Sequence, residues 1–521
     1  MRSFLKNLAF SPLAFVVSFA SGLGMGLTSA PVYAYFLGWI ALIPLWVLIC
    51  QPGVSFKRAL GLAIAWGAAY HGFALSWITG VHPMTWMGVP WLASLAIALF
   101  CWFFITLWGT LIVLSWVIGM RLYSNFMQPT TGLARCSRVL FGLTLWCALE
   151  AFWALGSLYW TTLAFTQSPY NLAILHLGQL SGATTISAAI AAVNGLIAEW
   201  LLAQATPAKP RPLFLALPIG LCLSLHLIGA SLLQAPLNPT PETALRVGII
   251  QGNIPNTIKL FPEGLRKAIE GYTAGYETLV AQGVDAVLTP ETALPFIWNE
   301  QNRRYSSFQQ AILRENTVAW LGTFSTQGSR LTNSLLTITG DGEIYSRYDK
   351  VKLVPLGEYI PFEDILGQLI NRLSPLDAHL APGSSEQIFD TPFGRAIVGI
   401  CYDSAFGNHF RRQTAAGGEF IITASNNAHY SATMPAQHHA QDVMRAIESD
   451  RWIVRATNTG YSGIVDPHGR TIWISGLNTY ETHADTIYRR QTQTLYVRWG
   501  DWLLLVLMGL SGLSIIQQKL T

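Results

Sequence analysis

Long stretches of this 521-residue chain contain no basic residue. No Lys or Arg occurs between Arg58 and Arg121, and none occurs between Arg138 and Lys209. Only 12% of the residues are charged, whereas an ordinary soluble domain has about 25%. A helix needs about 20 mostly apolar residues to cross a bilayer. The sequence therefore predicts an integral membrane protein.

The apolar runs predict eight membrane spans. They lie near 8–28, 32–50, 61–81, 91–120, 139–158, 174–203, 213–233 and 500–517. The fourth and sixth exceed one bilayer thickness, so we expect each to tilt or to include an interfacial turn. We expect a membrane domain at 1–238 with about seven helices, a soluble domain at 239–497 and a C-terminal span at 498–521.

Basic residues occur on alternate loops of this topology. They are Arg2, Lys6, Lys57, Arg58, Arg121, Arg135, Arg138, Lys209 and Arg211. Cytoplasmic loops are enriched in Lys and Arg, so the soluble domain is predicted to face away from the cytoplasm, and the last span returns Lys519 to it. The first run also resembles a cleavable signal peptide, and its cleavage would not change this orientation.

Two acids, Glu150 and Glu199, lie inside predicted spans, and intramembrane acids are candidate functional residues. Glu199 is near a span end, which predicts an interfacial position. Glu150 either holds a neighbouring helix or lines a cleft that lipids enter.

Cys401 is the only cysteine of the predicted soluble domain, and it follows an apolar run at 396–400. Without a partner in its own domain, it is either a core residue or a nucleophile. An unpaired thiol is unusual in an oxidising compartment, which favours reactivity. The other cysteines lie in or beside predicted spans, where we expect packing roles: Cys50, Cys101, Cys136, Cys147 and Cys222.

The soluble domain has the pattern of an α/β fold. Short apolar runs bounded by Gly, Pro and Asn predict buried strands, at 245–250, 286–288, 318–322, 334–338, 396–400, 420–423 and 453–456. Helices are predicted at 262–282, 303–315 and 436–449. Three polar residues follow predicted strands or lie near their ends: Glu291, Lys350 and Cys401. They would supply a base, a cation and a nucleophile, although spacing alone leaves surface positions open for Glu291 and Lys350.

The motifs around these residues resemble those of the nitrilase superfamily of carbon–nitrogen hydrolases. They are Gln251-Gly252-Asn253-Ile254-Pro255, Pro290-Glu291, the run 347–362 and Gly399-Ile400-Cys401-Tyr402-Asp403. Together with the predicted spans, nearly the whole chain resembles that superfamily's membrane branch, the apolipoprotein N-acyltransferase family. The resemblance implies a multi-span α-helical membrane domain and an α/β domain built as an αββα sandwich.

By the same resemblance, Glu291 is the general base, Lys350 the oxyanion stabiliser and Cys401 the nucleophile. Lys352 is the nearest competitor for the lysine role. Glu358 matches an additional active-site glutamate, and two supporting residues, Tyr402 and Asp403, follow the nucleophile.

The chain departs from the family pattern beside these residues. Asp403 stands where better-known members have Glu, Leu260 where Trp is common, and 425–430 reads Ser-Asn-Asn-Ala-His-Tyr in place of Ser-Asn-Asp-Ala-Trp-Phe. These changes concern substrate preference rather than the triad. The segment 360–382 has the apolar side chains of an amphipathic arm that contacts lipid, or of ordinary core packing.

The resemblance implies acyl transfer from a membrane phospholipid, through a Cys401 thioester, to the α-amino group of an S-diacylglyceryl-cysteine on an apolipoprotein. It implies a multi-pass protein of the bacterial inner membrane whose catalytic domain faces the periplasm or the cell exterior. A membrane-anchored amidase or nitrilase-type hydrolase and a non-catalytic lipoprotein-binding protein remain alternatives. No metal cluster or phosphate-binding loop is recognisable, so no cofactor and no metal are predicted. The net charge of +4 gives no sign of nucleic-acid binding.

Overall fold

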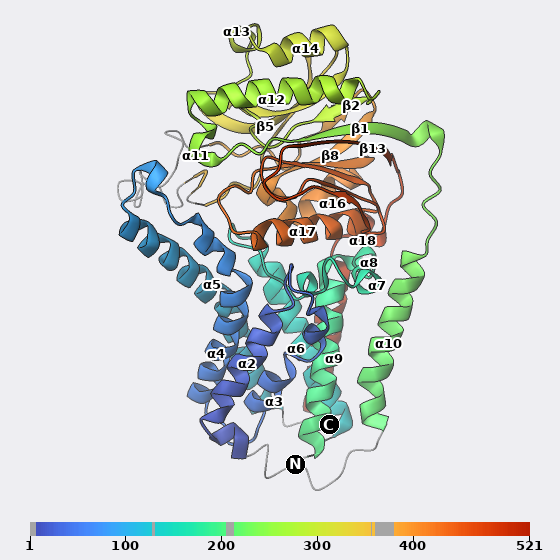
Figure 1. Cartoon of the computed structure of the whole chain (residues 1–521). Coiled ribbons are helices and arrows are strands. Elements are labelled where there is room, and N and C mark those ends of the chain that lie inside the picture. The colour runs from blue at the N-terminus through green and yellow to red at the C-terminus, as the bar shows by residue number, and fades with distance from the viewer. Residues whose placement is uncertain (1–6, 128–130, 205–212, 356, 360–379, 521) are drawn as a thin grey trace. The chain divides into compact units, whose positions relative to one another are not determined.

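The computed structural model describes residues 7–127, 131–204, 213–355, 357–359 and 380–520, and most of the predicted lipid-contacting arm lies outside them. The chain forms two compact units (Figure 1). The first comprises Met1–Thr79, Ala96–Ala235 and Trp499–Thr521, and the second comprises Gly80–Leu95 and Pro236–Arg498. The short segment Gly80–Leu95, between two apolar helices, thus belongs to the second unit.

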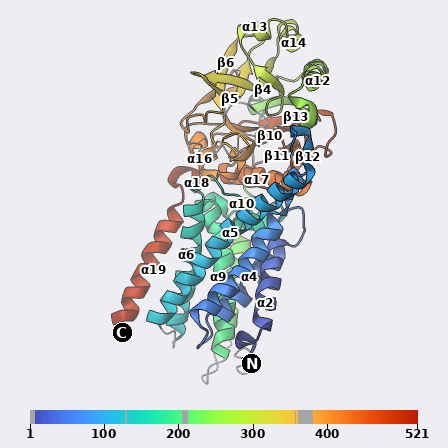
Figure 2. The ribbon, with the colours of Figure 1, turned by 90° about the vertical axis from the view of Figure 1, so that its left-hand side faces the viewer.

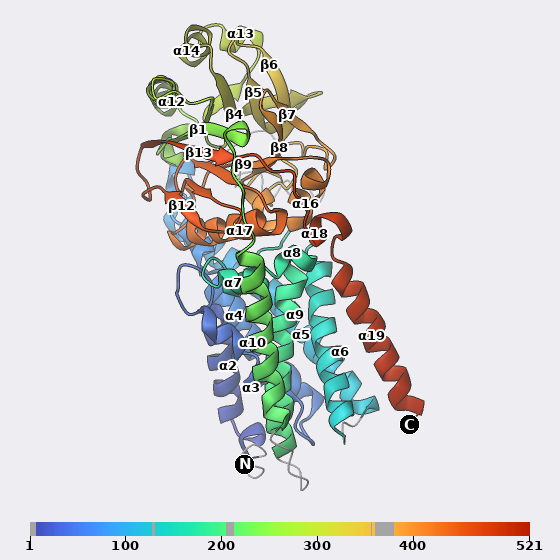
Figure 3. The same cartoon turned by 90° about the vertical axis from the view of Figure 1, so that its right-hand side faces the viewer.

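The first unit is built from apolar helices (Figure 3). They are α2 Leu13–Gly26, α3 Ile43–Ile49, α4 Phe56–Ala74, α5 Trp91–Phe126, α6 Gly132–Trp153, α7 Leu172–Leu175, α8 Gly178–Ser181, α9 Ala183–Gln204, α10 Leu213–Leu233 and α19 Trp502–Leu520. In the described part of the chain, five helices are long and apolar enough to cross a membrane: α5, α6, α9, α10 and α19. The chain is a membrane protein, as predicted.

Two of the predicted spans are interrupted. The run at 32–50 forms the 3-10 helix η1 Tyr35–Trp39 and the separate helix α3. The run at 174–203 is divided at Gly182, whose φ of +64° ends α8 before α9 begins. Glycine adopts this backbone conformation because it has no Cβ. The length of the apolar runs therefore predicted where these helices lie but not where they are interrupted.

Glu199 lies near the end of α9 and is buried among other helices. Arg138, from α6, donates from Nε and Nη2 to its two carboxylate oxygens at 2.7 Å each. Arg135 donates to the same carboxylate at 3.3 Å, and Trp46 of α3 donates at 3.1 Å. The cluster joins α3, α6 and α9 and satisfies both oxygens of the acid.

Glu150 is the partner of several elements of the first unit. Trp146 and the Leu163 N–H donate to one carboxylate oxygen at 2.9 and 2.8 Å. Thr162 and Ser187 donate to the other at 2.7 and 2.6 Å. This carboxyl group fastens α6 to α9 and to the segment between them, which favours a packing role.

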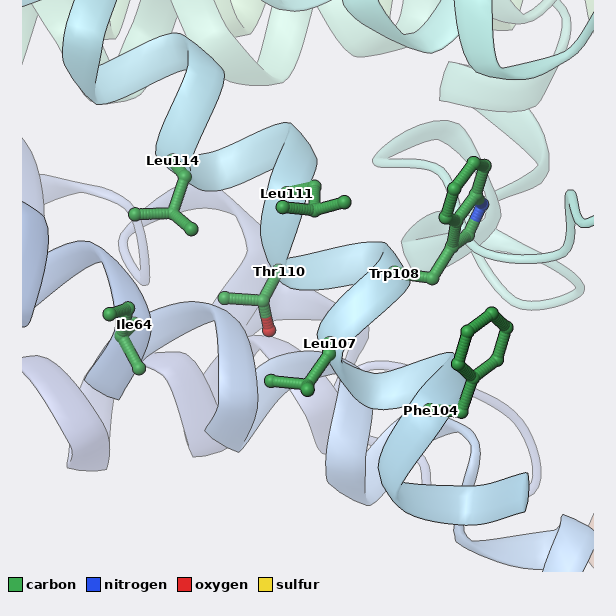
Figure 4. Close-up of a pocket in the computed structure, with 7 residues that line it drawn as sticks. All are labelled: Ile64, Phe104, Leu107, Trp108, Thr110, Leu111 and Leu114. Atoms are coloured by element: carbon green, nitrogen blue, oxygen red, sulfur yellow. The ribbon is translucent and has the colours of Figure 1, made fainter. Parts of the chain in front are cut away.

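An apolar pocket of about 330 Å³ lies between α4 and α5 (Figure 4). Ile64 of α4 and six residues of α5 line it: Phe104, Leu107, Trp108, Thr110, Leu111 and Leu114. Apart from the Thr110 hydroxyl and the Trp108 indole N–H, these side chains have no polar group, so the pocket has no acid, base or nucleophile for catalysis.

The second unit contains two β-sheets (Figure 2). The first has the order β13-β1-β2-β4-β5-β6 with β3 beside β4, and the second has the order β12-β11-β10-β9-β8-β7. The strands are β1 Ala244–Gln251, β2 Ala286–Leu288, β3 Leu294–Ile297, β4 Val318–Gln327, β5 Arg330–Ile338, β6 Ile344–Asp349, β7 Phe389–Thr391, β8 Gly394–Ile400, β9 Phe420–Ser425, β10 Ile453–Thr457, β11 Gly463–Val465, β12 Thr471–Ile474 and β13 Glu481–Tyr488. All the predicted strands are present.

Apolar side chains from both sheets form one core. Val247, Leu288 and Trp320 of the first sheet pack in the same cluster as Val398 and Ile422 of the second. Burial of such side chains is the main favourable contribution to folding.

Helices cover the outer faces of the sheets (Figure 1). Helices α12 Pro262–Val280 and α14 Ser307–Glu315 share a second core cluster with the first sheet, and α16 Gly407–Ala415 and α17 Thr433–Ser449 pack on the second. Shorter helices are α11 Asn256–Lys259, α13 Glu300–Arg303 and α18 Leu495–Trp499. The layers form the predicted αββα sandwich.

Candidate active site

Cys401 lies at a sharp turn between β8 and the 3-10 helix η6 Cys401–Ala405. Its φ of +50° is a left-handed conformation that a non-glycine residue rarely adopts. Such strain persists only where the surrounding structure enforces it, and it is concentrated at functional sites. The side chain is buried, with 7% of the residue exposed.

Asp403 fastens this turn. Its Oδ2 accepts hydrogen bonds from the Ile400 N–H at 3.0 Å and from the Tyr348 hydroxyl at 2.9 Å. Its Oδ1 accepts from the Lys352 N–H at 2.7 Å. The carboxylate therefore ties the end of β8 to the end of β6, which is a supporting position.

Lys350 follows the last residue of β6 and is 1% exposed. Its Nζ lies 2.9 Å from Glu291 Oε1 and 2.9 Å from Glu358 Oε1. Burial opposes the charge of the ammonium, but the two carboxylates outweigh it and raise the pKa of Lys350 well above its usual value. The lysine is thus a fixed cation between two acids.

Lys352, the competitor for this role, is placed elsewhere. Its Nζ lies 4.5 Å from the centroid of the Phe406 ring. The geometry therefore assigns the position between the glutamates to Lys350.

Glu291 and Glu358 are held by a shared amide. Asn333, on β5, donates from Nδ2 to Glu291 Oε1 at 2.7 Å and to Glu358 Oε1 at 3.2 Å. The Val354 N–H donates to Glu358 Oε2 at 2.8 Å. Both acids are consequently fixed on either side of Lys350.

The two acids differ in the direction of their pKa shifts. Burial opposes ionisation of Glu291, but Lys350, Lys259 and Asn333 outweigh it and lower its pKa. For Glu358, burial and the charge of Glu291 outweigh the attraction of Lys350, so its pKa is raised. Acids whose environments separate their pKa values are typical of acid–base catalysis. Glu291 is the one better suited to stand ionised as a proton acceptor.

The thiol of Cys401 is protonated at neutral pH. Burial and the nearby Glu291 carboxylate raise its pKa to about 12, against the attraction of Lys350 and a hydrogen bond from the Asn426 backbone. The lysine therefore does not generate a resting thiolate. A proton acceptor must act when the substrate arrives.

Lys259 is a site residue that sequence reasoning missed. It lies at the end of α11, is 3% exposed, and donates from Nζ to the Glu291 carbonyl at 3.0 Å and to Thr292 Oγ1 at 2.8 Å. Burial lowers its pKa to about 8, although the charges of Glu291 and Cys401 oppose the shift. Its only sequence signal is that it closely follows the motif at 251–255.

Asn333 was missed as well, because it lies one residue before the predicted strand at 334–338, among polar residues that carry no motif. A polar amide in the buried strand β5 was the available signal, since buried polar groups require partners.

Tyr402 lies beside the nucleophile, and the residues that depart from the family pattern flank the site in sequence. Tyr402 is half-buried, and its ring contacts that of Phe406 edge to face at 5.2 Å. The Trp86 ring is stacked over His429 at 6.2 Å, so the short segment of the second unit contacts the loop at 425–430. Leu260 is 41% exposed.

The described residues include no group of three or more His, Cys, Asp or Glu side chains that could hold a metal ion. An αββα sandwich with a glutamate–lysine–cysteine cluster defines a domain of the carbon–nitrogen hydrolase class. A family model of that class, described as carbon-nitrogen hydrolase, matches residues 246–495.

A second family model, described as the apolipoprotein N-acyltransferase N-terminal domain, matches residues 21–196. An apolipoprotein N-acyltransferase of Nostoc sp. (strain PCC 7120) is 58% identical over 94% of this chain and 96% of its own. One from Synechocystis sp. (strain PCC 6803) is 48% identical over 95% of this chain and 98% of its own. The chain belongs to the apolipoprotein N-acyltransferase family.

Proposed function

We propose that this acyltransferase moves an acyl chain from a membrane phospholipid to the α-amino group of an S-diacylglyceryl-cysteine at the N-terminus of apolipoproteins. The transfer passes through a thioester on Cys401. The observation that carries the proposal is the position of Lys350 between Glu291 and Glu358, with the strained Cys401 in the same unit. Membership of the family supplies the substrate class.

In the first half-reaction, Glu291 accepts the proton of the Cys401 thiol as the sulfur attacks the ester carbonyl of the phospholipid. The oxygen of the tetrahedral intermediate gains negative charge, which the Lys350 ammonium and the Tyr402 N–H stabilise. The carbon–oxygen bond of the ester then breaks. The leaving alkoxide takes the proton from Glu291 and departs as lysophospholipid, which leaves the acyl thioester.

In the second half-reaction, the lipoprotein amine attacks the thioester carbonyl. Glu291 accepts a proton from the attacking nitrogen, the carbon–sulfur bond breaks, and the thiolate regains a proton from Glu291. An amide has formed and the enzyme is unchanged. Because the two substrates enter in turn, ping-pong kinetics are expected.

Glu358 has a different task in this scheme. Its carboxylate, which Asn333 holds by a hydrogen bond, accepts a hydrogen bond from Lys350 and fixes the ammonium in one place. A donor that is already oriented needs no reorganisation when charge develops in the transition state. We propose that Glu358 positions Lys350 and does not exchange protons with the substrate.

Vesicles that contain the purified enzyme, a phospholipid with an isotope-labelled acyl chain and a synthetic S-diacylglyceryl lipopeptide test the reaction. The expected products are labelled N-acyl lipopeptide and lysophospholipid in equal amounts. An N-acetylated lipopeptide, which lacks the free amine, is the control acceptor. Labelled free fatty acid as the main product with the amine present would support the hydrolase alternative, and product formation by Cys401→Ala would support a non-catalytic role for this cysteine.

We also propose that the protein resides in the bacterial inner membrane with its catalytic unit on the non-cytoplasmic side. The distribution of basic residues supports this orientation. Tyr305 and Leu520 are 81% and 83% exposed, which suits them for labelling. A membrane-impermeant maleimide should label Tyr305→Cys but not Leu520→Cys in intact spheroplasts, and both after lysis. The reverse pattern would contradict the orientation.

A further inference from the structure

A buried imidazole contacts the nucleophile's own peptide group. His438, on α17, is fully buried, and its Nε2 lies 2.8 Å from the carbonyl oxygen of Cys401. A carbonyl oxygen only accepts hydrogen bonds, so Nε2 carries the proton. His438 does not touch the thiol in this contact, and the proposed mechanism does not use it.

The surroundings of His438 keep it in this tautomer. Asn427 Nδ2 lies 3.1 Å from His438 Nδ1, which places a donor against the ring nitrogen that has no proton. Burial and the charge of Arg455 lower the pKa of His438 to about 3. The ring is therefore neutral at physiological pH, with one donor and one acceptor, each paired.

The contact determines where the next N–H points. The carbonyl of Cys401 and the N–H of Tyr402 belong to one planar peptide group, and in a trans peptide they point in opposite directions. A donor that fixes the carbonyl on the α17 side therefore directs the Tyr402 N–H away from α17. A hydrogen bond to the carbonyl also polarises the peptide group and strengthens its N–H as a donor.

We propose that His438 is a positioning residue that aligns and polarises the Tyr402 N–H as an oxyanion donor for the Cys401 thioester chemistry. The inference rests on the proposed role of Cys401 as nucleophile. In this proposal, helix α17 contributes to catalysis indirectly, through the peptide group between Cys401 and Tyr402. Arg445, which donates to the Ser404 carbonyl at 3.2 Å from the same helix, supports the turn one step further on.

Two reactions of the Cys401 thiol distinguish a role of His438 in aligning the Tyr402 N–H from a role in stabilising the fold. Acylation by an ester develops an oxyanion, whereas alkylation by iodoacetamide displaces iodide and develops none. Both require that Cys401 be held in place and lose its proton. Only acylation requires an aligned Tyr402 N–H.

The experiment compares His438→Asn with His438→Gln in the full-length enzyme in phospholipid vesicles. Asn is too short to reach the Cys401 carbonyl, whereas the Gln side-chain amide replaces the Nε2 donor. His439→Asn is the matched control, because His439 is the next residue of α17, is also buried, and contacts Thr471 at 2.9 Å instead. Peptide mass spectrometry measures alkylation at Cys401, and intact mass measures acylation by phospholipid.

Removal of an oxyanion donor costs about 10²–10³ in rate, and we expect a misaligned donor in His438→Asn to cost about 10- to 100-fold in acylation. Alkylation should stay within about twofold of wild type, His438→Gln should recover most of the acylation, and His439→Asn should resemble wild type. Acylation and alkylation that fall together, or acylation that is unchanged, would overturn the proposal.

A second variant covers the case in which His438→Asn does not fold. Asn427→Ala removes the donor that holds His438 in one tautomer and leaves the imidazole in place. We therefore expect a smaller loss of acylation, with unchanged alkylation. Wild-type acylation by Asn427→Ala would then overturn the proposal. N-acyl product from Cys401→Ala would instead remove the proposed nucleophile and, with it, this inference.

Discussion

Both units of the molecule contain a buried cluster of acids and cations, and the two clusters are built differently. In the membrane unit, one carboxylate, Glu199, faces two guanidinium groups and an indole N–H, and each of its oxygens has at least one donor. In the catalytic unit, two carboxylates face one shared ammonium, that of Lys350. The first cluster has more cations than acids, whereas in the second two carboxylates share one direct ammonium partner and Lys259 lies beside Glu291.

Buried contacts between carboxylates and cations thus have two different roles in this molecule. A carboxylate held in a two-pronged contact with Arg is a fixed joint, because the paired hydrogen bonds define its orientation. Two acids that compete for one ammonium have separated pKa values, and one of them stands ready to accept a proton. We therefore propose that the membrane cluster holds helices together and that the catalytic cluster moves protons.

The comparison is tested most strongly by Glu291→Gln, which keeps the shape of the side chain and removes the proton acceptor. General-base catalysis contributes about 10²–10⁴ in rate, so acyl-enzyme formation should fall by about that factor. The melting midpoint should fall less than in Glu199→Gln, because Lys350 keeps Glu358 as an ion-pair partner. Stopped-time intact mass spectrometry measures the rate, and wild-type rates in this variant would contradict a catalytic role for the cluster.

The opposite response is expected of Glu199→Gln. Breaking a buried ion pair leaves an uncompensated charge and costs about 3–5 kcal/mol, so the melting midpoint should fall while turnover per folded molecule stays near wild type. Glu270→Gln is the control, since its pair with Arg266 is exposed on both sides and exposed pairs contribute about 0–1 kcal/mol. A stable Glu199→Gln with impaired catalysis would reverse the assignment of the two clusters.

Glu358→Gln distinguishes the proposed role of Glu358, which positions Lys350, from that of Glu291, which accepts protons. The charge of Glu358 raises the pKa of the Cys401 thiol, so its removal should shift the alkylation profile of Cys401 to lower pH. Acylation should nevertheless slow by about tenfold because Lys350 loses one of its two anchors. Iodoacetamide labelling across pH measures the first effect. An unchanged profile would show that the charge of Glu358 does not act on Cys401 in the resting enzyme.

The smallest effect concerns Lys259. Its ammonium lowers the pKa of Glu291, so Lys259→Met should raise that pKa. Glu291 accepts protons only above its own pKa, so the acid limb of the pH–rate profile should move to higher pH. Lys267→Met, which changes an exposed lysine paired with Glu263, is the control and should leave the limb in place. An unchanged limb in Lys259→Met would mean that Lys259 only supports the turn at Glu291.

The pH dependence of the stability of Lys259→Met also tests the charge of Lys259. The pKa of Lys259 is about 8 in the folded protein and near 10.5 in the unfolded chain. Between these values the unfolded chain binds more protons, so this residue contributes stability that rises with pH in that window. Lys259→Met should remove that rise without lowering the melting midpoint near pH 7. A lower midpoint would show that the contacts of Lys259 to Glu291 and Thr292 stabilise the fold.

The sequence predicted site residues correctly where they lie within or directly beside a local sequence pattern. The apolar run 396–400 located the strand before Cys401, and the motifs around Glu291, Lys350 and Glu358 located residues that the fold brings together. Strand β13, by contrast, is polar along much of its length and pairs with β1 at the sheet edge, so no apolar pattern marked it.

The residues that sequence reasoning missed act through tertiary contacts. Asn333, Lys259 and His438 lie 42, 32 and 37 residues in sequence from the groups they bind. No spacing rule relates such positions, because strand pairing and helix packing within each sheet layer must first bring them together. The partners of Glu199 could not be predicted for the same reason, since they lie on other helices.

Formation of the Cys401 thioester can be followed by the intact mass of the enzyme after brief exposure to phospholipid. Wild type should gain one acyl chain that hydroxylamine and a diacylated lipopeptide amine remove. Glu291→Gln should acquire it far more slowly, and Cys401→Ser should acquire none that the lipopeptide amine removes as N-acyl product. Equal rates in wild type and Glu291→Gln, or an acyl chain carried by a residue other than Cys401, would contradict the account.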